Sequence, residues 1–193
     1  MKMKLKEQRE YSICPHDEFC GGCIYQELSY EEQRLLKAKE VLHLMEEKGV
    51  DLSMLEQPFS LFDLIAAPKQ YRYRNKMEYT FGDFIKDGEM TLGMHKKGNF
   101  MSIVTVDECQ IVDEDFNLIL KATLEFCRQK GYSFYHKKTH KGLLRNLIIR
   151  KGERTCEILV NIVTSSQNEF AEEEYADLIY RLPLSNTPIG VNL

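Results

Sequence analysis

Hydrophobic and polar residues alternate in the stretch "YRYRNKMEYTF" at residues 71–81. Alternation with a period of two places every second side chain on the same face of a β-strand. One face of the predicted strand carries Tyr71, Tyr73, Asn75, Met77, Tyr79 and Phe81, and the other carries Arg72, Arg74, Lys76, Glu78 and Thr80. Because the three tyrosines share a face with Met77 and Phe81, we expect them in the core rather than as platforms for stacked bases.

Further strands follow along the chain. Asp87–Gly88 predicts a hairpin turn into "EMTLGMHK", and the apolar run "MSIVTV" predicts the next strand. The segments "GLLRNLIIR" and "RTCEILVNIV" flank Lys151–Gly152 and predict a second antiparallel hairpin.

Three segments have the period of helices. The first begins at Ser29, which forms a capping box with Glu32, and ends near Lys48 before Gly49. Its apolar stripe is Leu35, Ala38, Leu42 and Met45. The second runs from about Asp115 to Lys130, with Phe116, Leu120, Leu124 and Cys127 on one face, and the third from near Ser166 to before Pro183.

Strand pairs joined by tight turns, with helices between the sets, indicate an α+β fold. We expect an antiparallel β-sheet with flanking helices and an N-terminal cysteine-cluster loop. The predicted division is a loop-and-helix segment at residues 11–50 and a central α+β region at 51–193, with a connector over residues 50–70.

Composition places the chain among ordinary globular proteins. Of 193 residues, 43% are hydrophobic and 29% charged. No apolar stretch is long enough to span a bilayer, and "MKMKLKEQRE" is too polar for the core of a signal peptide. We therefore expect a cytoplasmic protein without membrane contact, whose cysteines are reduced thiols or metal ligands.

Charge is segregated along the chain. The net charge of −4 argues against a polyanionic partner, but "KQYRYRNK" carries four basic residues and no acid, and residues 137–154 carry seven basic residues against one glutamate. Acidic residues gather in "NEFAEEEYADL". This pattern is compatible both with one basic face and with separate solvated strand faces.

Three cysteines occupy ten consecutive positions. Cys14, Cys20 and Cys23 have the spacing C-x5-C-x2-C, and Gly21 and Gly22 allow a sharp bend between the last two. A short loop brings thiolates together at little cost in chain entropy, which favours a metal site. Structural zinc sites and cubane clusters both need a fourth ligand.

The candidates for that ligand are Cys109, Cys127, Cys156 and His16. Cys127 lies on the apolar stripe of a predicted helix, and Cys156 shares a strand face with Ile158, Val160 and Ile162, so both are expected in the core. His16 is separated from Cys14 by only one residue, which makes simultaneous ligation awkward. Cys109, in "VDECQI" at a strand end, is the preferred candidate. The spacing does not decide between zinc and iron–sulfur.

The cysteine spacing with "VDEC", "YRNKMEYTF", "LGMHKKG" and "GLLRNLIIR" resembles the RNA (uracil-5-)-methyltransferases, in the branch that modifies 23S rRNA and carries a [4Fe–4S] cluster. The resemblance covers about residues 13–165. It implies that Cys14, Cys20, Cys23 and Cys109 ligate the cluster and that the central region helps to hold RNA.

The family's catalytic parts have no counterpart in the sequence. Members continue into a Rossmann-like domain that binds S-adenosylmethionine and supplies a cysteine that attacks C6 of uracil and a base that removes the C5 proton. The chain has no glycine-rich nucleotide-binding signature, and neither Cys127 nor Cys156 fits the catalytic role. We therefore expect the cluster-bearing central part of a methyltransferase, inactive by itself, with S-adenosylmethionine bound only by the missing domain.

The expected RNA contacts are Arg72, Arg74, Lys76, Arg145, Arg150 and Lys151, and the expected partner is 23S rRNA. The cluster is expected to be structural rather than redox-active. The alternatives are a stand-alone zinc-binding RNA-interaction module and a chain with empty thiols. We expect His95, His136 and His140 at the surface or facing RNA. Self-association through the face left by the missing domain is a further expectation.

Overall fold

The computed structural model describes residues 14–54 and 64–193, so residues 11–13 of the predicted loop segment and residues 55–63 of the predicted connector lie outside it. The chain forms two compact units. The larger joins the residues up to Cys23 to Tyr71–Leu193, and the smaller consists of Ile24–Gln70. The cysteine loop therefore belongs to the unit that contains the sheet, whereas we had grouped it with the first helix.

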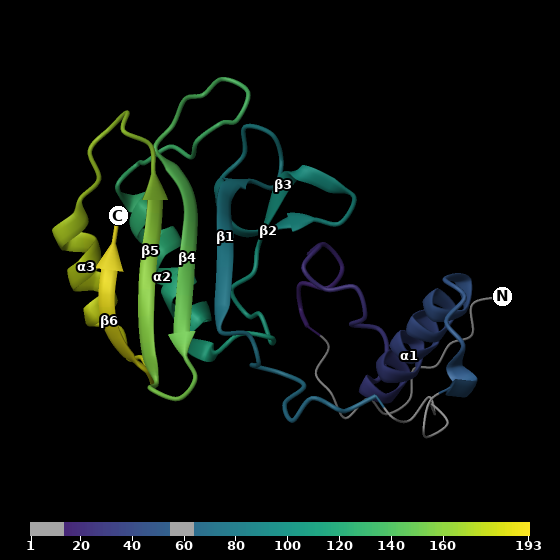
Figure 1. The fold of residues 1–193 in the computed structure, drawn as a ribbon. Helices are drawn as coiled ribbons and strands as arrows, with labels where there is room; N and C mark the ends of the chain where they lie inside the picture. The colour runs from purple at the N-terminus through teal and green to yellow at the C-terminus, as the bar shows by residue number, and fades with distance from the viewer. Residues whose placement is uncertain (1–13, 55–63) are drawn as a thin grey trace. The chain divides into compact units, whose positions relative to one another are not determined.

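The larger unit is built on a six-stranded mixed sheet (Figure 1). Its strands are β1 (Lys76–Asp83), β2 (Met90–Lys96), β3 (Asn99–Thr105), β4 (Leu144–Gly152), β5 (Glu157–Thr164) and β6 (Thr187–Asn192), in the order β3-β2-β1-β4-β5-β6. The first five pair antiparallel, as predicted, but β6 pairs parallel with β5. The predicted α+β class is confirmed.

Strand β1 begins five residues later than the alternating pattern predicts. Arg72 has a φ of 51°, a left-handed conformation that interrupts an extended strand. The backbone N–H groups of Arg72 and Arg74 donate to the carbonyls of Gln110 and Ile111 instead, at 2.9 and 3.0 Å. The side chain of Tyr73 is consequently 51% exposed, so its predicted core position was wrong, whereas Tyr79 is fully buried as predicted.

Both predicted hairpins form, with one change. The β1–β2 turn contains Asp87 in a left-handed conformation, with a φ of 61°. Strand β4 continues through Lys151 and Gly152, where we had placed the second turn, and the chain turns at residues 153–156. Cys156, with a φ of 56°, is exposed in this turn, so its predicted place in the core was wrong.

The smaller unit contains α1 (Tyr30–Glu47) and a 3-10 turn, η1 (Leu52–Met54). The predicted capping box is confirmed: the Glu32 N–H donates to the Ser29 hydroxyl at 3.3 Å, and the Ser29 N–H donates to the Glu32 carboxylate at 2.7 Å. Gly49 follows the helix with a φ of 70°.

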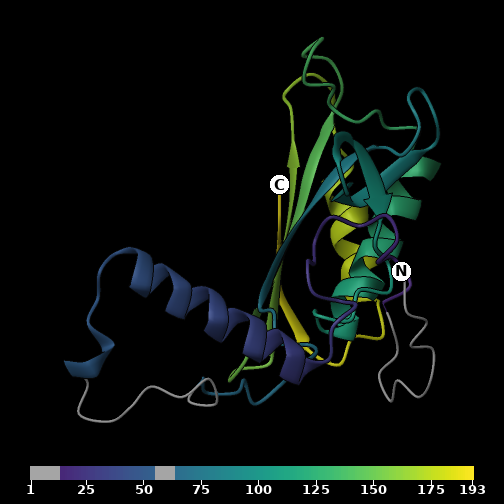
Figure 2. The ribbon, with the colours of Figure 1, turned by 90° about the vertical axis from the view of Figure 1, so that its right-hand side faces the viewer.

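The other two helices, α2 (Glu114–Gln129) and α3 (Glu172–Tyr180), cover the same face of the sheet (Figure 2). The predicted apolar face of α2 is buried in the core, and the helix packs on β2 and α3. Helix α3 begins six residues after the predicted start at Ser166. It connects β5 to β6, which the sequence did not predict as a strand because Pro188 and Gly190 weaken the strand signal.

The core lies between this helical layer and the sheet. Its largest fully buried side chains are Tyr79, Tyr175, Phe116, Leu92, Ile119, Leu120, Leu143, Leu144, Leu147, Ile149, Ile158 and Ile162. Within residues 14–54 and 64–193, no helix is both long and apolar enough to cross a membrane.

Candidate metal centre and nucleic-acid interface

The cysteine loop lies against the end of β2. The Gly21 N–H donates to the His95 carbonyl at 2.8 Å, and the Lys97 N–H donates to the Phe19 carbonyl at 2.8 Å. A Cβ atom at Gly21 would lie 2.9 Å from the His95 carbonyl oxygen, which is too close for any side chain there without a shift of the backbone. Glycine at this position therefore lets the loop carry Cys20 onto the sheet.

Cys109 lies between β3 and α2 and is held by Asn117, the fourth residue of α2. The Asn117 side chain accepts a hydrogen bond from the Cys109 N–H at 3.1 Å and donates to the Cys109 carbonyl at 3.2 Å. These two bonds fix the backbone of Cys109 to the helix. This role of Asn117 could not be predicted from the sequence, because an asparagine inside a helix has no characteristic pattern.

The four predicted ligands lie within electrostatic range of one another. Burial raises the pKa of the Cys109 thiol to about 11, and negative charge at Cys14, Cys23 or Cys20 raises it further. Burial likewise raises the pKa of Cys14 and of Cys20, and negative charge at Cys23 also raises the pKa of both thiols. The fold thus brings Cys109 to the side of the N-terminal loop.

Backbone N–H groups are directed at these sulfur atoms. The Gly22 N–H lies 3.3 Å from the Cys20 Sγ, and N–H donors at Ile111 and His16 lower the pKa of Cys109 and Cys14 respectively. Hydrogen bonds to sulfur stabilise the thiolate form that metal ligation requires.

The arrangement of the thiols is not that of a closed metal site. Among the described residues, no group of three or more His, Cys, Asp or Glu side chains is placed so that it could hold a metal ion. The chemistry of the donor set nevertheless fits a zinc ion or an iron–sulfur cluster, since both are held by four thiolates.

The Tyr79 hydroxyl bears on whether these residues fit such a group. Its hydroxyl is buried and has no hydrogen-bond partner within the described part of the chain. Burial raises the pKa of this phenol, and a negative charge at Cys109 raises it further, so the hydroxyl lies near that sulfur. A buried hydroxyl without a partner is costly, and a sulfur atom carrying negative charge would accept a hydrogen bond from it.

His16 contacts the segment that precedes Cys109. Its Nε2 accepts a hydrogen bond from the Glu108 N–H at 3.1 Å and lies 3.5 Å from a carboxylate oxygen of Asp107. The imidazole therefore ties the cysteine loop to this segment. Of the remaining candidates, Cys127 is fully buried in the core, as predicted, and its pKa is raised by burial to about 12.

Three of the six predicted RNA contacts already have carboxylate partners. Arg72 lies 2.6 Å from Glu114, and Lys76 lies 3.3 Å from Glu78. Lys151 lies 2.6 Å from Asp113, and only 14% of its side chain is exposed. The Lys151 ammonium thus serves an internal ion pair, which sequence reasoning could not foresee because Asp113 is far away along the chain.

The other three predicted contacts form no ion pair within residues 14–54 and 64–193. Arg74, Arg145 and Arg150 are all exposed. Arg150 on β4 stands directly opposite Lys76 on β1 in the antiparallel register. Like charges directly opposite one another on neighbouring strands are destabilising, so this pair would be relieved by an anion.

The predicted histidines lie in two different settings. His140 is exposed, as expected. His95 on β2 and His136 are each half-buried, and in each the Nδ1 atom is buried without a partner in the described structure.

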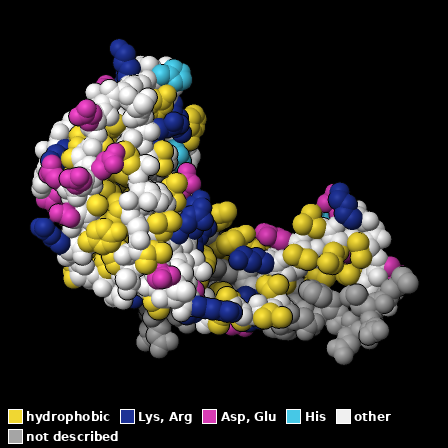
Figure 3. Space-filling model, turned by 60° about the vertical axis from the view of Figure 1, so that its left-hand side comes forward, with side chains coloured by type: hydrophobic (Ala, Val, Ile, Leu, Met, Phe, Trp, Pro, Cys, Tyr) yellow, Lys and Arg dark blue, Asp and Glu magenta, His cyan; other side chains and the backbone are white. Residues whose placement is uncertain are grey.

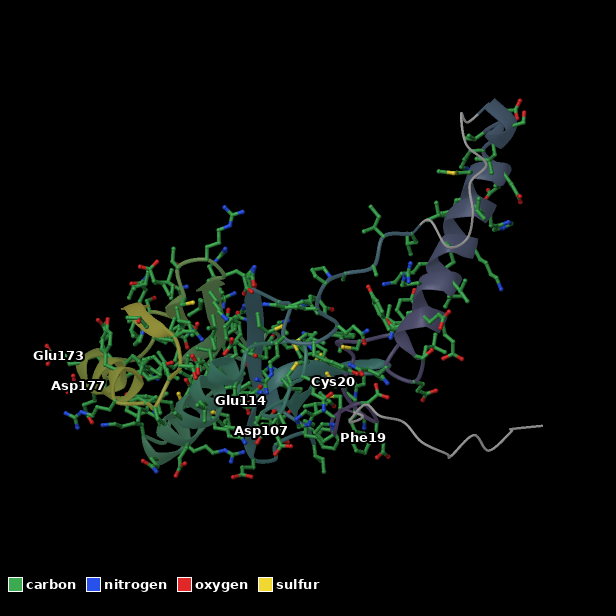
Figure 4. The ribbon with its side chains drawn as sticks, turned by 90° about the horizontal axis from the view of Figure 1, so that it is seen from below. Phe19, Cys20, Asp107, Glu114, Glu173 and Asp177 are labelled. Atoms are coloured by element: carbon green, nitrogen blue, oxygen red, sulfur yellow. The ribbon has the colours of Figure 1, made fainter. Side chains whose placement is uncertain are left out.

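The acidic residues of α3 lie away from the cysteine loop. Glu173 and Asp177 on α3 are at one end of the larger unit, and Phe19 and Cys20 are at the other (Figure 4). Figure 3 shows acidic side chains gathered toward one edge of the larger unit. The fold therefore preserves the segregation of charge seen in the sequence.

Comparison with known proteins gives the chain a family. No protein-family model matches it. It is 44% identical over 192 residues to an uncharacterized RNA methyltransferase of Clostridium tetani, 98% of this chain being covered, and 45% identical over 166 residues to one of Clostridium acetobutylicum, with 86% covered. It spans only 41% and 35% of the length of these relatives.

A solved structure shares the fold. It is a tRNA (uracil-54, C5)-methyltransferase of Pyrococcus abyssi in complex with S-adenosyl-L-homocysteine, with a TM-score of 0.59 and 25% sequence identity. The similarity covers 81% of this chain and 34% of that one. Since sequence and structure agree with the motifs, the chain belongs to the RNA (uracil-5-)-methyltransferase family.

Proposed function

We propose that this chain is the cluster-bearing, RNA-contacting part of an S-adenosylmethionine-dependent 23S rRNA (uracil-5-)-methyltransferase. The observation that supports the proposal is that the N-terminal loop meets the segment of Cys109: His16 Nε2 accepts a hydrogen bond from the Glu108 N–H at 3.1 Å, and negative charge at Cys14, Cys20 or Cys23 raises the pKa of the Cys109 thiol. Cys14, Cys20, Cys23 and Cys109 would hold a [4Fe–4S] cluster. Once bound, the cluster would join the loop covalently to the segment before α2.

A structural role for the cluster follows from where its ligands lie. The N-terminal loop meets the sheet through backbone hydrogen bonds with His95 and Lys97, an ion pair of Asp17 with Lys97 at 3.0 Å and a contact between the Phe19 and Phe84 rings. Four metal–sulfur bonds would hold the loop far more firmly than these contacts do. No redox partner is needed for that role.

RNA would be held by the exposed arginines of the larger unit together with Lys76. Lys76 and Arg150 are opposite each other in the β1–β4 register, Arg74 lies two residues before Lys76, and Arg145 lies toward the other end of β4. We assign Arg72 and Lys151 a structural role instead, because each is within 2.6 Å of a carboxylate.

Methyl transfer itself would be carried out by the part of the relatives that this chain does not match. Neither Cys127, buried in the core, nor Cys156, in an exposed turn, is placed to attack a uracil held by the basic residues. By this proposal the 193 residues supply no catalytic residue, and S-adenosylmethionine binds elsewhere in the whole enzyme. A cytoplasmic location and self-association of the isolated chain remain predictions.

The metal content tests the cluster. The chain is purified without oxygen, and its visible absorption is recorded with iron, sulfide and zinc quantified on the same sample. Broad visible absorption with about four irons per chain is expected. The same measurement on Cys109→Ser, with Cys156→Ser as the matched control outside the site, assigns the fourth ligand. One zinc per chain and no colour would support the zinc-binding module instead, and absence of both metals would reject a metal centre.

The RNA contact has a separate test. Binding of a labelled single-stranded RNA is measured as a function of salt for the wild type and for Arg74→Gln/Arg150→Gln. Each lost phosphate contact should lower the slope of log affinity against log salt by about 0.7 for single strands. A binding curve that does not respond to salt in the wild type would contradict the proposal.

A further inference from the structure

A second basic surface lies in the connection between α2 and β4. Residues 133–145, which we call the basic loop, carry Lys137, Lys138, Lys141 and Arg145 together with two histidines. No aspartate or glutamate occurs anywhere between Glu125 and Glu153. In Figure 1 this connection projects from the end of the sheet opposite the β4–β5 turn.

The cations of the basic loop are not neutralised by the protein. Within the described residues, Lys137, Lys138, Lys141 and Arg145 take part in no ion pair, whereas Lys151 is paired with Asp113. All three lysines of the loop are exposed: Lys137, Lys138 and Lys141. Unpaired like charges held close together repel one another, and a polyanion removes that repulsion while releasing its own counterions.

The loop has a fixed backbone. The His140 N–H donates to the His136 carbonyl at 2.8 Å, and the His136 N–H donates to the Lys141 carbonyl at 2.7 Å. From the end of β5, the Gln167 side chain donates to the His140 carbonyl at 2.6 Å and accepts from the Gly142 N–H at 3.2 Å. Such a loop loses little conformational entropy when it binds a ligand.

Gly142 is required for this conformation. Its φ is 112°, and a Cβ atom there would lie only 2.0 Å from the Phe134 carbonyl oxygen. The two strands of the loop can approach each other only because the position has no side chain.

An aromatic ring lies among the cations. The Arg145 guanidinium is stacked over the Tyr135 ring at 4.8 Å from its centroid, and the Tyr135 hydroxyl is 2.9 Å from Nδ1 of His140. A guanidinium on an aromatic face keeps its N–H groups free for phosphate oxygens, and rings in basic surfaces stack on unpaired bases. The ring is therefore held in one orientation by two neighbours.

We propose that the basic loop is a second RNA contact of this chain, which binds consecutive phosphates of a single-stranded segment through Lys137, Lys138 and Lys141 and stacks an unpaired base on the Tyr135–Arg145 pair. The proposal rests on the proposed function, which makes RNA the partner. Arg145 and Arg150 are five residues apart on β4, roughly 17 Å along a strand, so one RNA molecule can reach both basic surfaces.

The electrostatic part is tested with a labelled single-stranded oligouridylate and an RNA duplex of equal length. The variant is Lys137→Gln/Lys138→Gln/Lys141→Gln, and its matched control is Lys39→Gln/Lys48→Gln/Lys86→Gln, which removes the same charge from exposed lysines outside the loop. The loop variant should lower the salt slope on the single strand by roughly 2 and weaken binding at low salt more than tenfold. The control should change both far less.

The stacking part is tested by Tyr135→Ala against Tyr135→Phe. Loss of the ring should weaken binding of the single strand about tenfold, while the phenylalanine variant and duplex binding change little. Circular dichroism of every variant establishes that the fold is kept.

The outcomes separate the two proposals. If the wild type binds RNA and the loop variant matches the lysine control, the basic-loop proposal is overturned and the proposed function stands. If the wild type binds neither the oligouridylate nor the duplex, both the RNA part of the proposed function and the basic-loop proposal are rejected. The metal content still tests the cluster independently.

Discussion

Lys151 on β4 and Asp113, the N-cap residue of α2, form a half-buried ion pair with 2.6 Å between Nζ and Oδ2. The same aspartate caps the helix by accepting from the Asp115 N–H at 3.2 Å. The pair therefore joins the middle of the sheet to the start of the helix that covers it. Lys151, which we predicted from the sequence to contact RNA, stabilises the fold through this ion pair.

Replacing Lys151 by methionine should lower the free energy of unfolding by about 1–3 kcal/mol, because it leaves the Asp113 carboxylate without its partner. RNA binding and its salt slope should stay unchanged. Chemical denaturation and RNA titration on the same variant check both statements. Unchanged stability with a lower salt slope would show that Lys151 contacts RNA after all.

The same pair predicts a loss of stability in acid. Burial alone would raise the pKa of Asp113, but hydrogen bonds from Lys151 and the Asp115 N–H outweigh it, so the pKa is below its ordinary value of 3.8. A carboxyl group with a lowered pKa stabilises the fold above its unfolded pKa, and that stability is lost as the pH falls through the folded value. Asp113→Asn should show a shallower loss of stability than the wild type below about pH 4.

A second buried carboxylate holds the chain just before β6. Asp115 is 1% exposed and accepts hydrogen bonds from the Ser185 N–H at 2.9 Å, the Asn186 N–H at 2.7 Å and the Asn186 side chain at 2.7 Å. Asp115→Ala should cost roughly 2–4 kcal/mol of unfolding free energy, since three donors lose a charged acceptor.

Hydrogen exchange locates the effect of that change. Amide protection should fall first in residues 185–192, and the exposed neighbour substitution Glu114→Gln should leave it unaltered. Uniform loss of protection across the sheet, with no preference for β6, would contradict a local role of Asp115.

Patterns local in sequence predicted much of this fold. The Ser29 capping box, the apolar face of α2 and the buried positions Met77, Tyr79 and Phe81 all depend on neighbours within a few residues, and all are confirmed. The start of β1 was missed because the Gln110–Val112 segment binds the backbone of Arg72 and Arg74, a contact between distant parts of the chain.

The same distinction applies to the site. The C-x5-C-x2-C spacing was readable directly, and Cys109 stood out by its position at a strand end. Which basic residues are free to bind RNA could not be read, because their partners come from elsewhere: Glu114 for Arg72 and Asp113 for Lys151. A basic run in a sequence gives the number of charges but not how many remain unpaired after folding.

Removal of the Tyr79 hydroxyl should not lower the stability of the metal-free chain. In the metal-free chain its buried hydroxyl has no partner in the described structure, so Tyr79→Phe should leave the unfolding free energy unchanged or raise it by up to about 1 kcal/mol. Denaturation of the metal-free variant and wild type checks this. A loss above about 1 kcal/mol would mean that the hydroxyl has a hydrogen-bond acceptor even without metal.

We expect the buried Cys127 thiol to cause a loss of stability in alkali that is independent of the metal centre. Burial raises the pKa of its thiol from 9.0 to about 12, so the folded chain keeps this proton where the unfolded chain has lost it. The contribution is fully present below pH 9 and declines as the pH rises toward 12, by at most about 1.4 kcal/mol per pH unit. Cys127→Ala removes the thiol and should flatten this part of the profile, although the small cavity lowers its stability at neutral pH.

Lysines and the other thiols with a raised pKa titrate equally in the wild type and in Cys127→Ala, so the difference between the two stability profiles isolates Cys127. Parallel profiles from pH 8 to 11 would show that the Cys127 thiol ionises as readily in the folded chain as in the unfolded one.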